Sequence, residues 1–203
     1  IDTQYFIGSV TKQFAAVALL KALLDSNIQN GIDKNDVSSL KKRIQVDLNR
    51  PVAHYLSKEN SIWAGAMPEW ANTITIHQLL THTSGIFDYV LVPNYMGLLN
   101  NPLNIVELVS LFKDKDLDFA PGSKFSYSNS GYILIGAIIE QITGKTLDVY
   151  MQTMFFKPLK MSSTYFVTRG TLHEIKKDVD RFSNLARGYY YDIAPANPAP
   201  YEV

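Results

Sequence analysis

Long apolar runs at helical spacing dominate the chain and predict a mostly helical structure. Residues 10–24 begin with polar positions and are then apolar on all sides over residues 14–20. A helix that is apolar around its whole circumference is typical of a buried position, whereas a surface helix has a single apolar face. We therefore expect this helix at the centre of the fold. Its polar first turn, with Ser9 and Lys12, is expected to open onto a cleft, because polar groups need partners.

The same spacing predicts four further helices, over residues 75–80, 102–112, 130–142 and 146–156. Thr75 and Gln78 have the spacing of a capping box. Asn101 and Pro102 are interpreted as the cap and first residue of the next helix. Gly144 is expected to end the third of these helices, and Pro158 follows the fourth.

The remaining sequence predicts loops and little strand. Residues 25–62 are interpreted as a polar, loop-rich stretch, and the basic run at 41–43 within it as a solvated face. Turns are expected at residues 82–85 and 120–122. Weak strand signals occur only at residues 164–168 and 188–193, and the tail at 194–200 is too rich in proline for a helix or a sheet interior.

Composition narrows the classes of partner. Lys+Arg and Asp+Glu are both 19, so a net charge of zero gives no reason to expect nucleic acid. No cysteine is present, and the four histidines lack ligand spacing, so a metal site is not expected. No apolar run approaches the roughly 18–20 residues that span a bilayer, so membrane association is not visible in the sequence.

One pair of residues suggests nucleophilic catalysis. A serine hydroxyl needs a group that takes its proton, and a lysine three residues later on a helix lies on the same face. This spacing occurs at Ser9/Lys12, Ser38/Lys41, Ser39/Lys42 and Ser110/Lys113. Only Ser9 follows a glycine at the start of a buried helix, whose free N–H groups favour an oxyanion. From spacing alone, Ser9 is either a nucleophile or an ordinary N-cap.

A second motif strengthens the catalytic interpretation. Tyr127-Ser128-Asn129 is the only Tyr-x-Asn in the chain. A tyrosine hydroxyl can pass a proton to a leaving group, and an asparagine amide can hold a lysine and donate to a substrate carbonyl. The alternative is a loop tyrosine beside an Asx turn. A Ser-His-Asp site built on His82 is rejected, because the chain has no Gly-x-Ser-x-Gly elbow.

Together the motifs resemble a known superfamily. Residues 8–14, Gly-Ser-Val-Thr-Lys-Gln-Phe, resemble the first active-site motif of the serine β-lactamases and penicillin-binding proteins. The branch that is most similar contains class C β-lactamases, D-alanyl-D-alanine carboxypeptidases and esterases. Further stretches match this branch in order, at residues 76–85, 121–132, 138–144, 158–161 and 186–189.

The resemblance implies a role for each site residue. Ser9 attacks a carbonyl and becomes acylated, and its backbone N–H is one oxyanion donor. Lys12 is its proton acceptor or electrostatic partner. Tyr127 handles the proton in acylation and deacylation, and Asn129 contacts Lys12 and the substrate amide. The stretch around His82 is a structural turn in this family. The family also implies an extracytoplasmic setting and no cofactor.

The chain departs from the family pattern in two places. The third motif, Lys-Thr-Gly or His-x-Gly on a strand, is absent, since Lys145-Thr146 is followed by Leu147. Lys160 stands where relatives often have glycine, which suggests a less strained turn. Only eight residues precede Ser9, so the strands that precede the nucleophile helix in the family are also absent.

The expected fold class is mainly α: the helical lobe of an α+β β-lactamase/transpeptidase-like fold, with the antiparallel sheet largely missing from this chain. We expect residues 1–203 to be one β-lactamase-related domain, as a fragment; the alternative is a naturally trimmed homologue with another use. Residues 1–27 would form the nucleophile helix, 28–187 the helical lobe and 188–203 the return toward the sheet domain. Alone, this chain should be poorly stable or inactive.

The predicted function is a serine acyl hydrolase or transferase that works through an acyl-enzyme. The expected substrates are β-lactams, D-Ala-D-Ala peptides or small esters. The alternative is a non-catalytic β-lactamase-like module that binds or senses such ligands. An intact set of Ser9, Lys12, Tyr127 and Asn129 argues against it, because a pure binder needs no activated serine.

Overall fold

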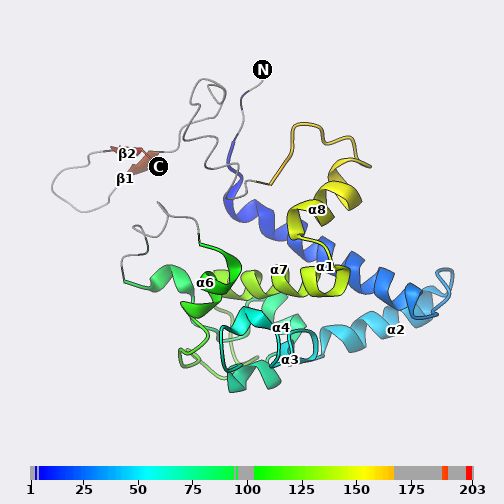
Figure 1. Ribbon diagram of the computed structural model, residues 1–203, viewed down its shortest axis with the longest axis horizontal. Coiled ribbons are helices and arrows are strands. Elements are labelled where there is room, and N and C mark those ends of the chain that lie inside the picture. The colour runs from blue at the N-terminus through cyan, green and yellow to red at the C-terminus, as the bar shows by residue number, and fades with distance from the viewer. Residues whose placement is uncertain are drawn as a thin grey trace. The chain divides into compact units, whose positions relative to one another are not determined.

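The computed structural model describes residues 3, 5–93, 95, 103–166, 189–191 and 200–202, with the backbone alone for the last two segments. The chain divides into two compact units, one formed by Ile1–Thr11 with Phe166–Val203 and the other by Lys12–Tyr165. The larger unit is helical in its described residues, which confirms the expected fold class (Figure 1). The subdivision into residues 1–27, 28–187 and 188–203 stays a prediction.

The smaller unit contains one short antiparallel pair of strands, β1 (Tyr189–Tyr191) and β2 (Pro200–Glu202), with Tyr190 opposite Tyr201. β1 lies inside the strand predicted over residues 188–193. The other predicted strand, at 164–168, is wrong for residues 164–166, which have no strand structure. Residues 167 and 168, and the tail at 194–199, lie outside the described residues.

The larger unit is built around one central helix, α7 (Asn129–Thr143). It contacts α3, α4, α6 and α8, and most of its apolar side chains are buried (Figure 1). The other described helices are α1 (Thr11–Gln29), α2 (Val37–Leu48), α3 (Val52–Tyr55), α4 (Ile76–Leu80), α6 (Ile105–Ser110) and α8 (Leu147–Met151). Short turns of other helical types are η1 (Gly8–Val10), η2 (Ser61–Trp63), η3 (Glu69–Asn72), η4 (Tyr89–Leu91) and the π-helical η5 (Gln152–Phe156).

Local cap chemistry sets several helix ends where the sequence predicts them. Thr75 and Gln78 form the expected reciprocal capping box of α4. Gly144 has a φ of 64° and ends α7 with its N–H bonded to the Glu140 carbonyl. α6 starts later than predicted, because Asn104 and Glu107 form its capping box. The predicted cap at residues 101 and 102 lies outside the described residues.

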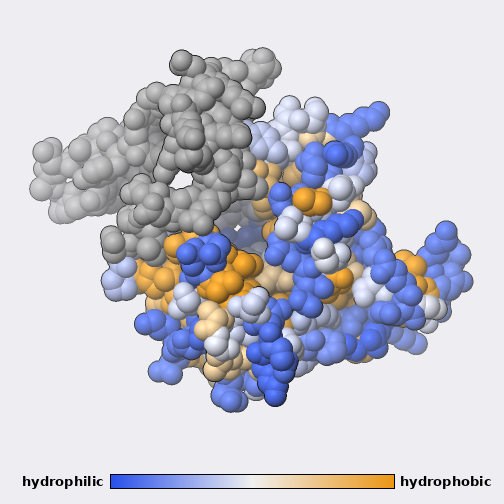
Figure 2. Space-filling model, viewed as in Figure 1, coloured by the Kyte–Doolittle hydropathy of each residue, from blue (hydrophilic) through white to orange (hydrophobic). Residues whose placement is uncertain are grey.

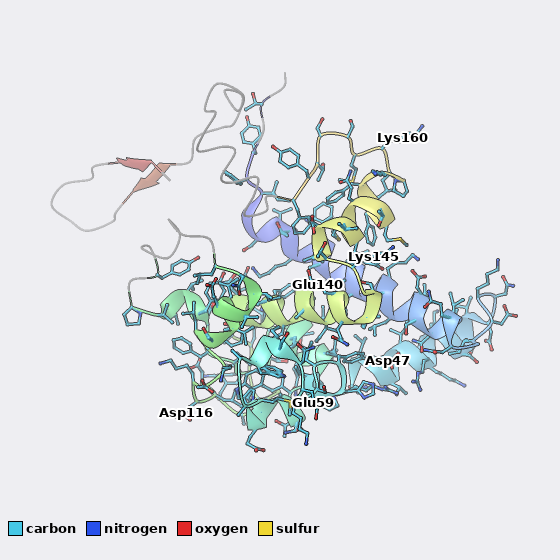
Figure 3. The ribbon with its side chains drawn as sticks, viewed as in Figure 1. Asp47, Glu59, Asp116, Glu140, Lys145 and Lys160 are labelled. Atoms are coloured by element: carbon cyan, nitrogen blue, oxygen red, sulfur yellow. The ribbon has the colours of Figure 1, made fainter. Side chains whose placement is uncertain are left out.

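The loop-rich interpretation of residues 25–62 is wrong, because α2 and α3 lie there. Asp36 caps α2 by accepting from the Ser39 N–H at 3.0 Å. The apolar residues of α2 have helical spacing, at Val37, Leu40, Ile44 and Leu48, but Leu40 is its only buried apolar residue. Its attachment is polar instead. Asp47, labelled in Figure 3, is buried near the end of α2 and accepts from the Asn27 amide of α1 at 2.7 Å.

α1 is not buried all round in this structure. Ala18, Leu19 and Leu23 are buried, as expected for a central helix. Val17 and Leu20, however, are 53% and 39% exposed on the opposite face. Figure 2 shows that hydrophobic surface also lies among polar side chains on the visible face of the molecule. The expectation of complete burial is therefore wrong for this face of α1 within the described chain.

The expectation of a relaxed turn at Lys160 is also wrong. Lys160 has a φ of 56°, the left-handed conformation in which the neighbouring carbonyl crowds a Cβ. Its N–H bonds to the Lys157 carbonyl at 3.1 Å, and the Met161 N–H bonds to the Phe156 carbonyl at 2.8 Å. This pair of bonds is the Schellman arrangement, whose left-handed position usually holds glycine. The lysine side chain points away from the helices (Figure 3).

Candidate active site

Lys12 lies in the first turn of α1, where its ammonium group donates to Oδ1 of Asn129 at 2.8 Å. The two residues are 117 positions apart in the sequence. The same ammonium lies 4.8 Å from the centroid of the Tyr127 ring and 5.6 Å from that of the Tyr132 ring. Both are within the range of a cation–π contact. The structure therefore brings together three of the four predicted site residues, Lys12, Tyr127 and Asn129.

Ser9, the fourth, lies in the short turn η1 that immediately precedes α1. Gly8 has a φ of 49°, which explains the glycine before the serine, since this conformation penalises a Cβ. The Val10 N–H bonds to the Ile7 carbonyl at 3.1 Å, and the Thr11 N–H bonds to the Gly8 and Ser9 carbonyls. Ser9 belongs to the smaller unit, three residues before Lys12.

The other three Ser-x-x-Lys pairs lie in different surroundings. Ser110 is the last residue of α6, and its hydroxyl donates to the Glu107 carbonyl at 2.6 Å. Lys113 is buried and its ammonium pairs with Asp114 at 2.8 Å. The pairs that begin at Ser38 and Ser39 are on α2, where Lys41 and Lys42 are exposed. A solvated face was predicted for this basic run.

The start of α7 is held by three consecutive side chains. Ser128 donates its hydroxyl to the Ile86 carbonyl at 3.2 Å. The Ser130 hydroxyl donates to the Phe87 carbonyl at 2.7 Å and accepts from the Tyr89 N–H at 2.9 Å. Between them, Nδ2 of Asn129 donates to the Asp88 carboxylate at 2.9 Å. Four hydrogen bonds thus attach residues 128–130 to residues 86–89.

His82 packs against the aromatic side chains beside this junction. Its ring stacks on Tyr127 with centroids 4.4 Å apart, and it also contacts Phe125 and Tyr132. Its Nδ1 accepts from the Ser128 N–H at 3.1 Å. Burial, followed by the charge of Lys12, lowers the pKa of His82 below its ordinary value. His82 therefore supports the Tyr127 ring as a neutral imidazole.

Sequence reasoning missed one residue of this site, Asp88. Its carboxylate is 8% exposed and faces Asn129. The signal was present: Asp88 is the one charged residue between Gly85 and Leu91, in an otherwise apolar and aromatic stretch. A charge in such a stretch requires a partner when it is buried. The partner could not be identified without the fold, because it is 41 residues away.

Lys145 and Thr146, which partly match the family's third motif, belong to the turn between α7 and α8. Thr146 is the N-cap residue of α8, and the Lys145 N–H bonds to the hydroxyl of Thr143 at 3.3 Å. Both residues connect α7 to α8, as the label of Lys145 in Figure 3 indicates. They lie in the turn after α7 rather than on a strand.

Metal-binding groups and membrane-spanning helices can be assessed in the part of the chain that the structure describes. There, no three or more His, Asp or Glu side chains are grouped so that they could hold a metal ion. No described helix combines the length and the apolar character that crossing a membrane requires.

The larger unit thus holds a lysine hydrogen-bonded to an asparagine beside a tyrosine ring, groups that can orient and transfer a proton. Comparisons with known proteins identify the family. The Beta-lactamase family model matches residues 2–172, so the chain belongs to the β-lactamase family.

Three relatives illustrate the match. Protein flp of Staphylococcus aureus strain N315 is 31% identical over 164 residues, which are 81% of this chain and 28% of that protein. A D-stereospecific amidohydrolase from Streptomyces sp. is 29% identical with a TM-score of 0.57, covering 76% of this chain and 42% of that one. A penicillin-binding protein from Bacillus halodurans shares the fold, with a TM-score of 0.65 and 23% identity, over 98% of this chain and 52% of that one.

The chain thus spans about half or less of the length of these relatives.

Proposed function

We propose that the protein is a serine acyl hydrolase or transferase that works through an acyl-enzyme on Ser9. The observation that carries this proposal is the hydrogen bond between Lys12 and Asn129, beside the ring of Tyr127. A structural lysine would be satisfied by a carboxylate, as Lys113 is by Asp114. Lys12 donates to the side-chain oxygen of Asn129, an acceptor that carries no net charge.

In the proposed reaction, the Ser9 hydroxyl oxygen bonds to the carbonyl carbon of the substrate. The hydroxyl proton passes either to Lys12 in its amine form or to the Tyr127 oxygen beside the charge of Lys12, and the carbonyl becomes an oxyanion that the Ser9 N–H stabilises. In the first case the proton moves on from Lys12 to Tyr127 as Tyr127 gives up its own. Tyr127 then delivers a proton to the leaving amine or alcohol as its bond to the carbonyl breaks. Water or another acceptor releases the acyl group by the reverse path.

The contacts of Asn129 and Tyr127 are consistent with these roles. Asn129 uses one Nδ2 hydrogen for Asp88, so the second can donate to a substrate carbonyl. The ring of Tyr127 stacks on His82, which supports it on one side. Tyr127 is also 43% exposed, so a substrate could reach it. The substrate class is proposed to be β-lactams, D-Ala-D-Ala peptides or small esters. The Streptomyces relative is an amidohydrolase, which supports an amide or ester carbonyl as the target.

The first testable prediction is covalent labelling of Ser9. The complete protein, incubated with a fluorophosphonate or a penicillin, should gain the mass of one adduct, and peptide mapping should place it on Ser9. Ser9→Ala should abolish the adduct because the nucleophilic oxygen is removed. Ser110→Ala is the matched control, since Ser110 has the same spacing to a lysine and should leave labelling unchanged.

If the folded protein gains no adduct with either reagent, the acyl-enzyme proposal is wrong. The non-catalytic binding module would then be favoured, and binding of the penicillin without a mass change would support it. An adduct that persists in Ser9→Ala would assign the nucleophile to another residue.

A further inference from the structure

We propose that Asp88 is a positioning residue for the acyl-transfer site, acting on Lys12 through the side chain of Asn129. This inference rests on the proposed function, because it assigns a purpose to the orientation of a site residue. It starts from two contacts of one amide: Asn129 accepts from Lys12 at 2.8 Å and donates to Asp88 at 2.9 Å.

The chemistry of the two neighbours leaves the amide one orientation. A lysine ammonium has only donors, and an ionised carboxylate has only acceptors. Turning the Asn129 amide over would place its NH₂ group against the ammonium and its oxygen against the carboxylate. Both contacts would be repulsive. Asp88 therefore holds Oδ1 toward Lys12 and keeps the NH₂ group on the other side.

Asp88 itself is firmly held. Its side chain is 8% exposed, so a change of rotamer would have to displace its neighbours. The second carboxylate oxygen accepts from the Val90 N–H at 3.4 Å, as the cap of η4. The serines on either side of Asn129 bond to the Ile86 and Phe87 carbonyls before Asp88, and the Ser130 hydroxyl also accepts from the Tyr89 N–H after it. The carboxylate and the amide thus face one another across a fixed junction.

The arrangement also explains why a carboxylate is buried near a lysine without contacting it. A direct pair between Asp88 and Lys12 would keep the ammonium in a strong, charge-assisted bond. With Asn129 between them, the negative charge of Asp88 orients the amide whose oxygen accepts from Lys12. Asp47 provides an internal comparison: it is also buried and accepts from the amide of Asn27, but it pairs directly with Arg50 at 3.3 Å.

The test is a double-mutant cycle on the acylation rate of the complete protein, measured by stopped-flow with a chromogenic β-lactam or ester. Asp88→Ala should slow acylation by about 10–100-fold, which is the effect of losing one charged hydrogen-bond partner. Asn129→Ala removes the group through which Asp88 acts. Adding Asp88→Ala in that background should then change the rate less than about twofold.

Each result decides the matter. Equal slowing by Asp88→Ala with and without Asn129 would overturn the inference, as would no slowing in the single variant. Wild-type protein that forms no Ser9 adduct would overturn the proposed function first, and this inference with it. If Asp88→Ala does not fold, the isosteric Asp88→Asn is measured in the same cycle, where the same non-additivity is required.

The matched control is Asp47→Asn, which removes a buried carboxylate with an asparagine partner far along the chain from the site residues. It should lower the unfolding midpoint without coupling to Asn129 in the acylation rate. A coupling at Asp47 as large as that at Asp88 would show that the cycle reports general destabilisation, and would overturn the inference.

Discussion

His82 has a left-handed backbone, with a φ of 56°, and its ring is stacked on Tyr127. The conformation places Nδ1 where it accepts the Ser128 N–H, directly before the first residue of α7. Protonation of Nδ1 would break this bond. The sequence predicts the turn from its Thr-His-Thr-Ser-Gly pattern. It could not predict the stack, which depends on where residues 125–132 fold back onto α4.

The pKa of His82 makes stability depend on pH in a defined direction. Burial and the charge of Lys12 lower the pKa of His82, and Asp88 opposes this shift. The unfolded chain, with an ordinary histidine pKa near 6.5, then binds a proton that the folded protein resists. Stability is therefore complete above about pH 6.5 and should fall as the pH is lowered through the pKa of the folded protein.

This dependence is the prediction at the residue scale. The midpoint of urea unfolding should fall between about pH 7.5 and about pH 5. His82→Asn should reduce the slope, since asparagine tolerates the left-handed backbone and does not titrate. His54, whose pKa is also lowered by burial and by Arg50, contributes to the same window. His54→Gln is thus the second variant, and an unchanged slope in His82→Asn would contradict the prediction.

At the scale of elements, the sequence predicted those helix ends that depend only on residues close together in the chain. The capping box at Thr75 and the glycine stop at Gly144 need only residues within one turn, and both are confirmed. α2 was missed although Val37, Leu40 and Ile44 have helical spacing, because the polar and basic residues around them were interpreted as a loop. Asp47 bonds to Asn27 of α1, 20 residues earlier, and to Arg50. No apolar periodicity records such a polar attachment.

The turn after η5 carries the element-scale prediction. Lys160→Gly should raise the free energy of unfolding by about 0.5–1 kcal/mol, because relief of the left-handed strain exceeds the greater backbone entropy of glycine. Chemical denaturation of the complete protein measures the change. Lys160→Ala is the control: it removes the same charge but retains the strained Cβ. Equal unfolding free energies in the glycine and alanine variants would contradict the backbone explanation.

At the scale of the whole molecule, the predicted site is spread over distant parts of the chain. Lys12 comes from α1 and Asn129 from α7, and the order of motifs along the sequence indicated that they belong to one site. The ordered motifs also identified the family, and the match of the Beta-lactamase family model to residues 2–172 confirms it. They gave no information about Asp88, because its role depends on a contact rather than a motif. That this chain alone is poorly stable or inactive stays a prediction.

The exposed face of α1 gives the prediction for the whole molecule. Among the described residues, Val17 and Leu20 are the exposed apolar side chains of α1. If the complete protein covers this face, Val17→Gln and Leu20→Gln should each cost about 1.5–3 kcal/mol there. In the isolated 203-residue chain the same changes should stay within about 0.5 kcal/mol, as at other exposed positions. Unfolding of both forms, with exposed Gln13→Ala as the control, measures the difference. Small effects of Val17→Gln and Leu20→Gln in the complete protein would show that nothing packs on this face of α1.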